Sequence, residues 1–125
     1  MIRTYKDLLF WQSSFEVSKY CIKLVRLLPK ENIAFVITNQ LLRACASVGA
    51  NISEGYGRYG TKEYARFLQM SLGSANETEY WLLLLIETYP KLKNEIDKII
   101  NKNIETIKML TASVNKIRKN KSYTL

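Results

Sequence analysis

The chain has 125 residues and a formal net charge of +8, and it contains no histidine. Its length suits one domain with a single core, and its charge favours an acidic partner such as nucleic acid or an anionic surface. The lack of histidine excludes Ser-His-Asp and Cys-His catalysis and the common zinc sites. The two cysteines, Cys21 and Cys45, occupy apolar helical positions, so buried free thiols are favoured over a disulfide.

The apolar segments are short. The N-terminal sequence MIRTYKDLLFWQ lacks the long apolar region of a signal peptide. The longest apolar run, residues 81–86, is far shorter than the ~20 residues that span a bilayer. We therefore expect a soluble cytoplasmic protein that binds no membrane.

The first two predicted helices are separated by a proline. Residues 7–28 form the first helix, and Pro29 ends it because proline cannot continue a helix from within. The second helix is predicted over residues 32–56, with Asn32 as its N-cap, and the sequence GYGRYGT ends it. The apolar face of the first helix is expected to carry Leu8, Trp11, Phe15, Cys21, Ile22 and Val25.

Two further helices follow. Thr61 is expected to cap a third helix over residues 61–89, and Pro90 separates it from a fourth helix over residues 92–119. Short loops between long helices predict an all-α fold, an up-down-up-down antiparallel four-helix bundle that fills one domain, residues 1–125. The fourth helix has apolar residues at three- and four-residue steps: Ile96, Ile99, Ile100, Ile104, Ile107, Leu110, Val114 and Ile117.

The positive charge is concentrated at the C-terminal end. Residues 91–125 hold nine basic and three acidic side chains, which account for six of the eight net charges. This pattern fits either a nucleic-acid-binding surface or a solvated helix face that only keeps the protein soluble. The candidate binding residues are Lys98, Lys102, Lys108, Lys116, Arg118, Lys119 and Lys121, with Lys19, Lys23 and Arg26 as a second choice.

Aromatic residues near these lysines offer a second kind of contact. Tyr20, Tyr56, Tyr59 and Tyr123 could stack on unpaired bases, although packing is favoured for the first two. The two tryptophans are expected to be core aromatics rather than cofactor contacts.

The second helix has three faces when it is drawn at 100° per residue. Glycine inside a helix costs about 1 kcal/mol relative to alanine, so a strip of small residues suggests that another backbone approaches closely. The polar stripe is Gln40, Arg43, Ser47, Asn51, Glu54 and Arg58, the apolar stripe is Ile37, Leu41, Cys45, Val48 and Ile52, and the small strip is Ala46, Gly49, Ala50, Ser53 and Gly57.

The third helix offers a matching polar stripe: Arg66, Met70, Gly73, Ser74 and Glu77. If the two helices form a hairpin near Gly60, facing residues have numbers that add to about 120. This register predicts two salt bridges, Arg43 with Glu77 and Glu54 with Arg66. It also predicts a close contact between Ser47 and Gly73.

We interpret this polar stripe as structural, ahead of a binding surface or a catalytic site. None of its residues can act as a base near pH 7 without a large pKa shift. Glu54 and Glu77 could bind a divalent cation, but arginines opposite them already supply the countercharge. No metal, cofactor or catalytic residue is therefore expected.

The sequences QLLRACASVGANISEGYGR and FLQMSLGSANETE resemble the four-helix-bundle family of proteins encoded in intervening sequences of bacterial 23S ribosomal RNA genes, also labelled S23 ribosomal proteins. The resemblance covers about residues 7–90. Cys45 and Gly49 stand where the family tends to have alanine and proline. The matching residues are Trp11, Gln12, Gln40, Arg43, Ala44, Ser47, Val48, Asn51, Ile52, Glu54, Gly55, Arg58, Phe67, Leu68, Gly73, Ser74 and Glu77.

The resemblance implies a left-handed four-helix bundle that assembles into a homopentamer. The small strip, or the Asn51–Arg58 end of the polar stripe, would then meet a neighbouring subunit. The accessory protein of diversity-generating retroelements is similar in fold, and that basic pentamer binds nucleic acid and a reverse transcriptase. The favoured function is therefore a non-enzymatic oligomer that binds structured RNA through its phosphates, and the alternative is an adaptor whose main partner is another protein, such as a reverse transcriptase.

Overall fold

The fold comes from a computed structural model, which describes residues 1–58 and 60–119. In these residues there are four α-helices and no strands, as the sequence predicted. The helices are α1 (Leu9–Val25), α2 (Asn32–Tyr56), α3 (Thr61–Thr88) and α4 (Lys93–Lys119), and short 3-10 helices cover Tyr5–Asp7 and Pro90–Leu92.

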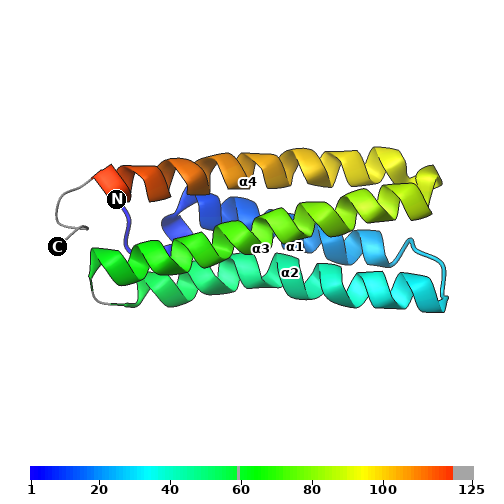
Figure 1. Cartoon of the computed structure of the whole chain (residues 1–125), viewed down its shortest axis with the longest axis horizontal. Coiled ribbons are helices and arrows are strands. Elements are labelled where there is room, and N and C mark those ends of the chain that lie inside the picture. The colour runs from blue at the N-terminus through cyan, green and yellow to red at the C-terminus, as the bar shows by residue number, and fades with distance from the viewer. Residues whose placement is uncertain (59, 120–125) are drawn as a thin grey trace.

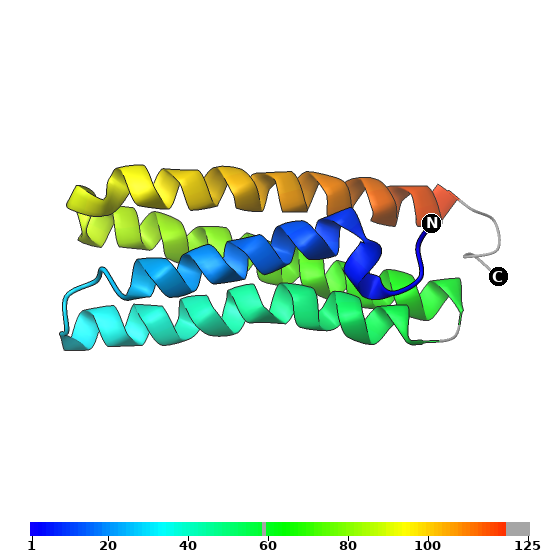
Figure 2. The same cartoon turned by 180° about the vertical axis from the view of Figure 1, so that it is seen from behind.

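The four helices lie side by side as long rods with alternating direction (Figures 1 and 2). The N-terminus, the turn between α2 and α3 and the end of α4 lie at one end of the molecule. Within the described residues the backbone of each helix lies close to that of two neighbours, in the order α1, α2, α3, α4 and back to α1. The side chains between them form two buried apolar clusters, one toward each end of the bundle.

Several helix ends differ from the sequence prediction. The first helix is split: Thr4 caps the 3-10 turn in a capping box with Asp7, and α1 begins only at Leu9. The backbone N–H groups of Arg3 and Thr4 donate to the Asp7 carboxylate and hold its pKa below the usual value. The split arises because this box satisfies the backbone at residues 4–7 before the α-helix starts.

The caps of α2 and α3 also differ from the prediction. Glu31, not Asn32, is the N-cap of α2, and its side chain makes no capping bond. Gly60, not Thr61, precedes the first helical residue of α3. Its φ of 87° lies in the region that glycine adopts without steric cost, so the turn requires glycine at this position.

The apolar stripe of α2 and the apolar residues of α4 face the core as predicted. The prediction of which side of α1 faces the core was wrong in part. Phe15 and Ile22 are 50% and 45% exposed, whereas the serines Ser13 and Ser14 are buried. Hydropathy treats serine as polar, so it assigned the wrong side of α1 to the core. The core side of α1 is in fact Phe10, Ser13, Ser14, Val17, Cys21 and Leu24.

Buried polar side chains join α4 to its two neighbours. The hydroxyls of Ser13 and Thr106 lie 2.6 Å apart and link α1 to α4. The amide of Asn103 donates to the carbonyl of Ala75 at 2.9 Å and links α3 to α4. Both bonds are buried. Sliding one helix along the other would break such a bond, and each buried polar group left unpaired would cost about 1–3 kcal/mol of stability.

Two further bonds join α2 to its neighbours. The Ser71 hydroxyl donates to the carbonyl of Val48 at 2.8 Å, between α3 and α2. The Ser18 hydroxyl donates to the carbonyl of Cys45 at 3.1 Å, between α1 and α2. Each of the four helix–helix contacts thus carries at least one side-chain hydrogen bond, and in the described residues no buried side-chain nitrogen or oxygen lacks a partner.

The cysteines are buried free thiols, as predicted. A hydrogen bond with Cys45 and burial in the core raise the pKa of the Cys21 thiol. A neutral, buried thiol reacts slowly, so this pair belongs to the core.

The close approach of α2 and α3 is not where the sequence placed it. A Cβ added to Gly73 would meet nothing within 4 Å, so the predicted contact with Ser47 is wrong. A Cβ added to Gly55 would lie 2.5 Å from the Cβ of Phe67. Gly55 therefore lets the end of α2 pack against α3 before the turn.

We expect Gly55→Ala to lower the free energy of unfolding by about 1–3 kcal/mol, because the added methyl overlaps the backbone-proximal part of Phe67. Gly57→Ala is the matched control, since the nearest atom to its added Cβ is 3.7 Å away. It should be neutral or stabilising by up to about 1 kcal/mol. Urea unfolding followed by circular dichroism measures both, and equal effects would contradict the packing argument.

Candidate functional site

The polar stripe forms one salt bridge between α2 and α3, as predicted. The Arg43 guanidinium donates to Glu77 Oε2 at 2.9 Å and to the Gln40 side chain at 2.7 Å. The Trp81 indole N–H donates to the same Glu77 oxygen at 2.9 Å. Glu77 therefore accepts two bonds and joins the surfaces of the two helices.

The second predicted salt bridge, between Glu54 and Arg66, is wrong. Glu54 pairs with Arg58 at 2.8 Å, and Arg66 pairs with Glu63 at 3.0 Å, each within its own helix. The hydrogen bond from Arg66 also lowers the pKa of Glu63. Side chains three or four residues apart on one helix are neighbours, so each of these charged groups pairs within its own helix and not with the facing helix.

The rest of the polar stripe is also paired locally. The Asn51 amide donates to the Ser47 carbonyl at 2.9 Å, and the Ser74 carbonyl accepts from the Thr78 hydroxyl at 2.8 Å. No group of three or more His, Cys, Asp or Glu that could hold a metal ion occurs in residues 1–58 and 60–119. On this side of the bundle, the hydrogen bonds of the described residues join α2 to α3 or lie within one helix.

The small strip of α2 packs partly against α1. The Trp11 indole N–H donates to the Ser53 hydroxyl at 3.1 Å, and a Cβ at Gly49 would lie 3.6 Å from the same indole nitrogen. Trp11 also stacks on Phe15, with ring centroids 5.0 Å apart. The glycine and serine therefore make room for an indole of the same chain, whereas Ala46 and Ala50 stay exposed.

The predicted basic residues are at the surface but do not gather in one place. Lys108, Lys116, Arg118 and Lys119 are exposed on α4, and Lys121 lies outside the described residues. Of the second-choice residues, Lys19 pairs with Glu16 at 3.1 Å, and Arg26 is exposed directly after the end of α1. The structure brings together three others, Lys98 and Lys102 of α4 with Lys23 of α1.

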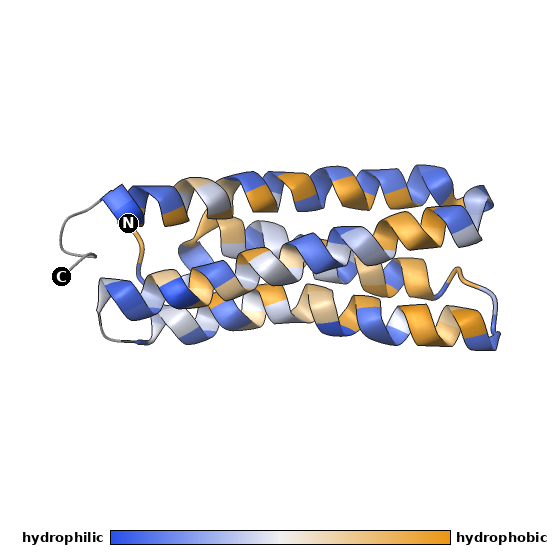
Figure 3. Ribbon diagram, viewed as in Figure 1, coloured by the Kyte–Doolittle hydropathy of each residue, from blue (hydrophilic) through white to orange (hydrophobic). Residues whose placement is uncertain are grey.

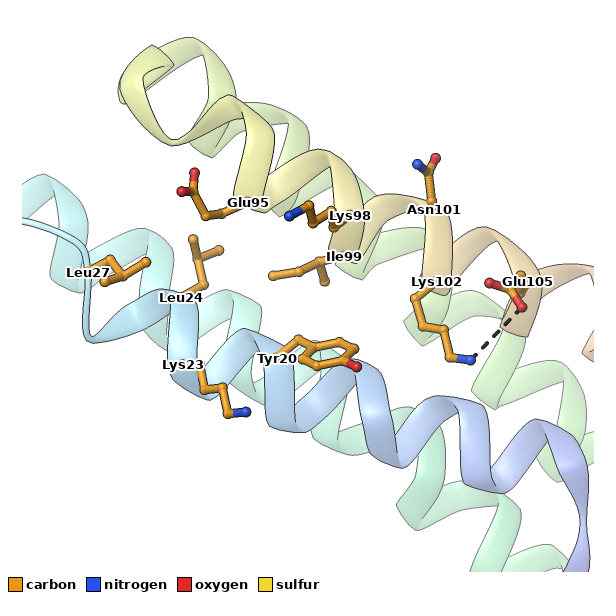
Figure 4. A pocket seen from close by; sticks show the side chains of 10 residues that line it. All are labelled: Tyr20, Lys23, Leu24, Leu27, Glu95, Lys98, Ile99, Asn101, Lys102 and Glu105. Atoms are coloured by element: carbon orange, nitrogen blue, oxygen red, sulfur yellow. Dashed lines mark ion pairs between the residues drawn. The ribbon is translucent and has the colours of Figure 1, made fainter.

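These three lysines line a groove of about 470 Å³ between α1 and α4 (Figure 4). Leu24 and Ile99 form its buried floor. The Tyr20 ring extends from α1 into the groove and is 40% exposed. We name this feature the α1–α4 groove; it is lined by Tyr20, Lys23, Leu24, Leu27, Glu95, Lys98, Ile99, Asn101, Lys102 and Glu105.

The groove combines positive charge at its edges with an apolar floor. Lys102 reaches from α4 toward α1 and lies 3.9 Å from Glu105 (Figure 4). The Lys23 ammonium lies 5.9 Å from the centroid of the Tyr20 ring. Such a surface can hold an anion at its rim and a flat apolar group on its floor.

The groove was not predicted, because its residues come from two helices that are far apart in the sequence, and packing was favoured for Tyr20. One signal could have found it. Tyr20 and Lys23 are three residues apart and so share one side of α1, and Lys98 and Lys102 are four apart on α4. The contact between α1 and α4, which brings these two pairs of residues together, could not be read from the sequence.

A different surface, made of exposed apolar side chains, lies over α1 and α2. Phe15, Phe35, Ala46 and Ala50 are exposed, and with Ile22 they form what we call the apolar α1–α2 surface. Phe15, Ala46 and Ala50 line one shallow hollow there. Figure 3 shows apolar residues on the outer side of α2 near its beginning, whereas α4 carries polar residues along its outer edge.

By length and composition alone, α2 is long and apolar enough to span a membrane, and the same is true of many buried helices in water-soluble proteins. Of its most apolar 18-residue stretch, 39% is buried inside the bundle. Its charged residues are Arg43 and Glu54, and both are already in ion pairs. Much of the apolar surface of α2 therefore has no partner in the single chain.

The fold agrees with comparisons to known proteins. A family model described as 23S rRNA-intervening sequence protein matches residues 6–112. The chain belongs to this family. The resemblance found in the sequence is thereby confirmed, and the family match extends into α4.

A crystal structure of a family member shows the same fold. It is a protein with unknown function from the S23 ribosomal protein family of Bacteroides thetaiotaomicron. The two chains are 33% identical with a TM-score of 0.78, and the match covers 85% of this chain and 98% of the other. No curated protein matches the chain significantly.

The corrected pairing can be measured by double-mutant cycles. We expect Arg43→Met and Glu77→Gln to show a coupling energy of about 0.2–1 kcal/mol in urea unfolding, because the pair is partly exposed. The control cycle, Glu54→Gln with Arg66→Met, should show a coupling energy within about 0.3 kcal/mol of zero, since these side chains do not touch. Coupling in the control cycle would restore the original prediction.

Proposed function

We propose that this 23S rRNA-intervening sequence family protein is a non-enzymatic, basic oligomer that binds structured RNA through phosphate contacts in the cytoplasm. The observation that carries the proposal is the meeting of Lys23, Lys98 and Lys102 at the α1–α4 groove. Exposed basic residues continue along α4 beyond the groove, at Lys108 and Lys116. The family description, which refers to 23S rRNA, supports RNA over other polyanions.

Binding of this kind is read through charge more than through sequence. Each lysine that neutralises a phosphate releases counterions, so the affinity falls steeply as salt rises. Phosphate contacts position the protein without selecting bases. In the polar stripe of α2 and α3, by contrast, the charged side chains and the amide of Asn51 are already engaged in hydrogen bonds, which supports a structural role for the stripe.

The same proposal includes assembly of left-handed bundles into a homopentamer. The support is the apolar α1–α2 surface, since exposed apolar patches of this kind mark interaction sites. A ring of identical subunits uses two different surfaces of each subunit, and the apolar α1–α2 surface would be one of them. Five subunits would raise the charge from +8 to about +40, a strong attraction for RNA.

A second candidate function is an adaptor whose main partner is another protein, such as a reverse transcriptase. It is favoured by a separate group of exposed apolar residues on α3, where Met70, Tyr80 and Leu83 are 43%, 58% and 50% exposed. An adaptor would remain oligomeric at high salt and bind RNA weakly. The RNA titration therefore separates the two functions.

We expect the affinity for a structured RNA to fall steeply between about 50 and 300 mM salt in fluorescence anisotropy. The triple variant Lys23→Gln, Lys98→Gln and Lys102→Gln should bind more weakly and reduce the slope of log K against log salt by about 3. A matched duplex DNA should show whether RNA is preferred.

The matched control removes the same charge elsewhere. The control is the triple variant Lys30→Gln, Lys62→Gln and Lys91→Gln, whose three lysines do not line the groove. It should reduce the slope of log K against log salt by less than about 1. Equal losses in the two triple variants would mean that net charge alone attracts RNA. Weak binding by the unmodified oligomer at low salt would favour the adaptor.

The assembly can be tested with one substitution. Ala46→Glu places a charge on the apolar α1–α2 surface, and we expect it to shift the mass measured by light scattering from about five chains toward one. Ala112→Glu, at an exposed position of α4, is the control and should leave the mass unchanged. An unchanged mass in Ala46→Glu would move the subunit interface to another surface.

A further inference from the structure

We propose that the α1–α4 groove binds one unpaired RNA base, stacked on Tyr20, with the neighbouring phosphates held by lysines at the rim. The proposal rests on the proposed RNA binding and adds what the RNA must present. A fully paired helix would satisfy the phosphate contacts alone, whereas a bulge or loop would also fill the groove.

The shape of the groove fits a base. Its volume of about 470 Å³ lies within the ~300–1,000 Å³ typical of small-molecule sites. The Tyr20 ring of α1 and the Ile99 side chain of α4 lie on facing sides of the groove (Figure 4). An exposed aromatic ring beside apolar side chains is the kind of surface on which single-stranded bases stack.

The charges of the groove favour a neutral guest inside and anions outside. Glu95 and Glu105 line the groove and would repel a phosphate placed within it. Their carboxylate oxygens, and the amide of Asn101, can accept hydrogen bonds from the amino group of a base. Lys23 of α1 and Lys98 and Lys102 of α4 line the groove (Figure 4), and their ammonium groups can neutralise phosphates that flank the base.

Another hollow of the molecule is a weaker candidate. The hollow at the end of the bundle, beside Pro29 and Pro90, has a volume of about 490 Å³. Its only lining lysine among the described residues is Lys91, and the hydroxyl of its tyrosine, Tyr89, donates to Glu31 at 2.6 Å. Of these two hollows, the α1–α4 groove is the one lined by three lysines and a tyrosine whose hydroxyl has no such acidic partner among the described contacts.

The test uses three RNA hairpins that differ at one position: fully paired, with a single bulged adenosine, and with an abasic site in the bulge. At one fixed salt concentration we expect the adenosine bulge to bind about 10-fold more tightly than the other two, because only it offers a base to stack. Tyr20→Leu should abolish this difference and leave the affinity for the paired hairpin unchanged. Tyr20→Phe should retain the difference, since it keeps the ring.

Tyr80→Leu is the matched control. Tyr80 is 58% exposed on α3, away from the groove, and its loss should leave the preference for the bulge intact. Equal affinity of the unmodified protein for the three hairpins, with the salt dependence intact, would overturn the base-binding site and leave the phosphate contacts standing. Failure to bind any hairpin would overturn both proposals.

A second measurement needs no variant. A hairpin with 4-thiouridine at the bulge is cross-linked to the unmodified protein by light, and the attached residue is found by mass spectrometry. A cross-link at Tyr20 or in residues 95–105 supports the groove. A cross-link confined to other residues overturns it.

Discussion

Four side-chain hydrogen bonds, one at each helix–helix contact, set the arrangement on which the rest of the structure depends. Apolar surfaces between helices attract without fixing how far one helix slides along another. The hydroxyl pair of Ser13 and Thr106 restricts that freedom for α1 and α4, because sliding would break the bond and leave the buried Ser13 hydroxyl without its partner, whereas Thr106 would keep its bond to the Lys102 carbonyl. The bond from Ser71 to the Val48 carbonyl does the same for α2 and α3. Each bond contributes only about 1 kcal/mol net, but together they select one register.

The surfaces follow from that register. In a pair of antiparallel helices, residues with higher numbers on one helix lie opposite residues with lower numbers on the other. Ser13 lies opposite Thr106, so the residue seven positions later on α1, Tyr20, lies opposite Ile99, seven positions earlier on α4. Seven residues are two helical turns and return to the same side of the helix. The hydrogen bond buried in the core thus determines which side chains meet at the groove on the surface.

The sequence predicted much of the fold because long amphipathic helices and two prolines leave few alternatives. It also predicted the pair of Arg43 with Glu77, since a hairpin register depends only on where the turn lies. It failed where the outcome depends on which of several partners a long side chain reaches, as for Glu54 and Arg66. It failed again for Phe15, because hydropathy cannot tell that Ser13 is buried through a bond to another helix. The groove belongs to this second kind of failure, because it exists only once α1 and α4 are placed together.

The two proposed surfaces are compatible because α1 separates them. Residues two apart on a helix differ by about 200°, so Ile22 and Tyr20 point to nearly opposite sides of α1. Ile22 belongs to the apolar α1–α2 surface, and Tyr20 belongs to the α1–α4 groove. Subunits that associate through the first surface would leave the second open to solvent and repeat it once in each subunit. Weak contacts between one base and one groove would then add across a ring, provided that the RNA is long enough to reach several grooves. A modest affinity at each groove is therefore consistent with firm binding by the assembly.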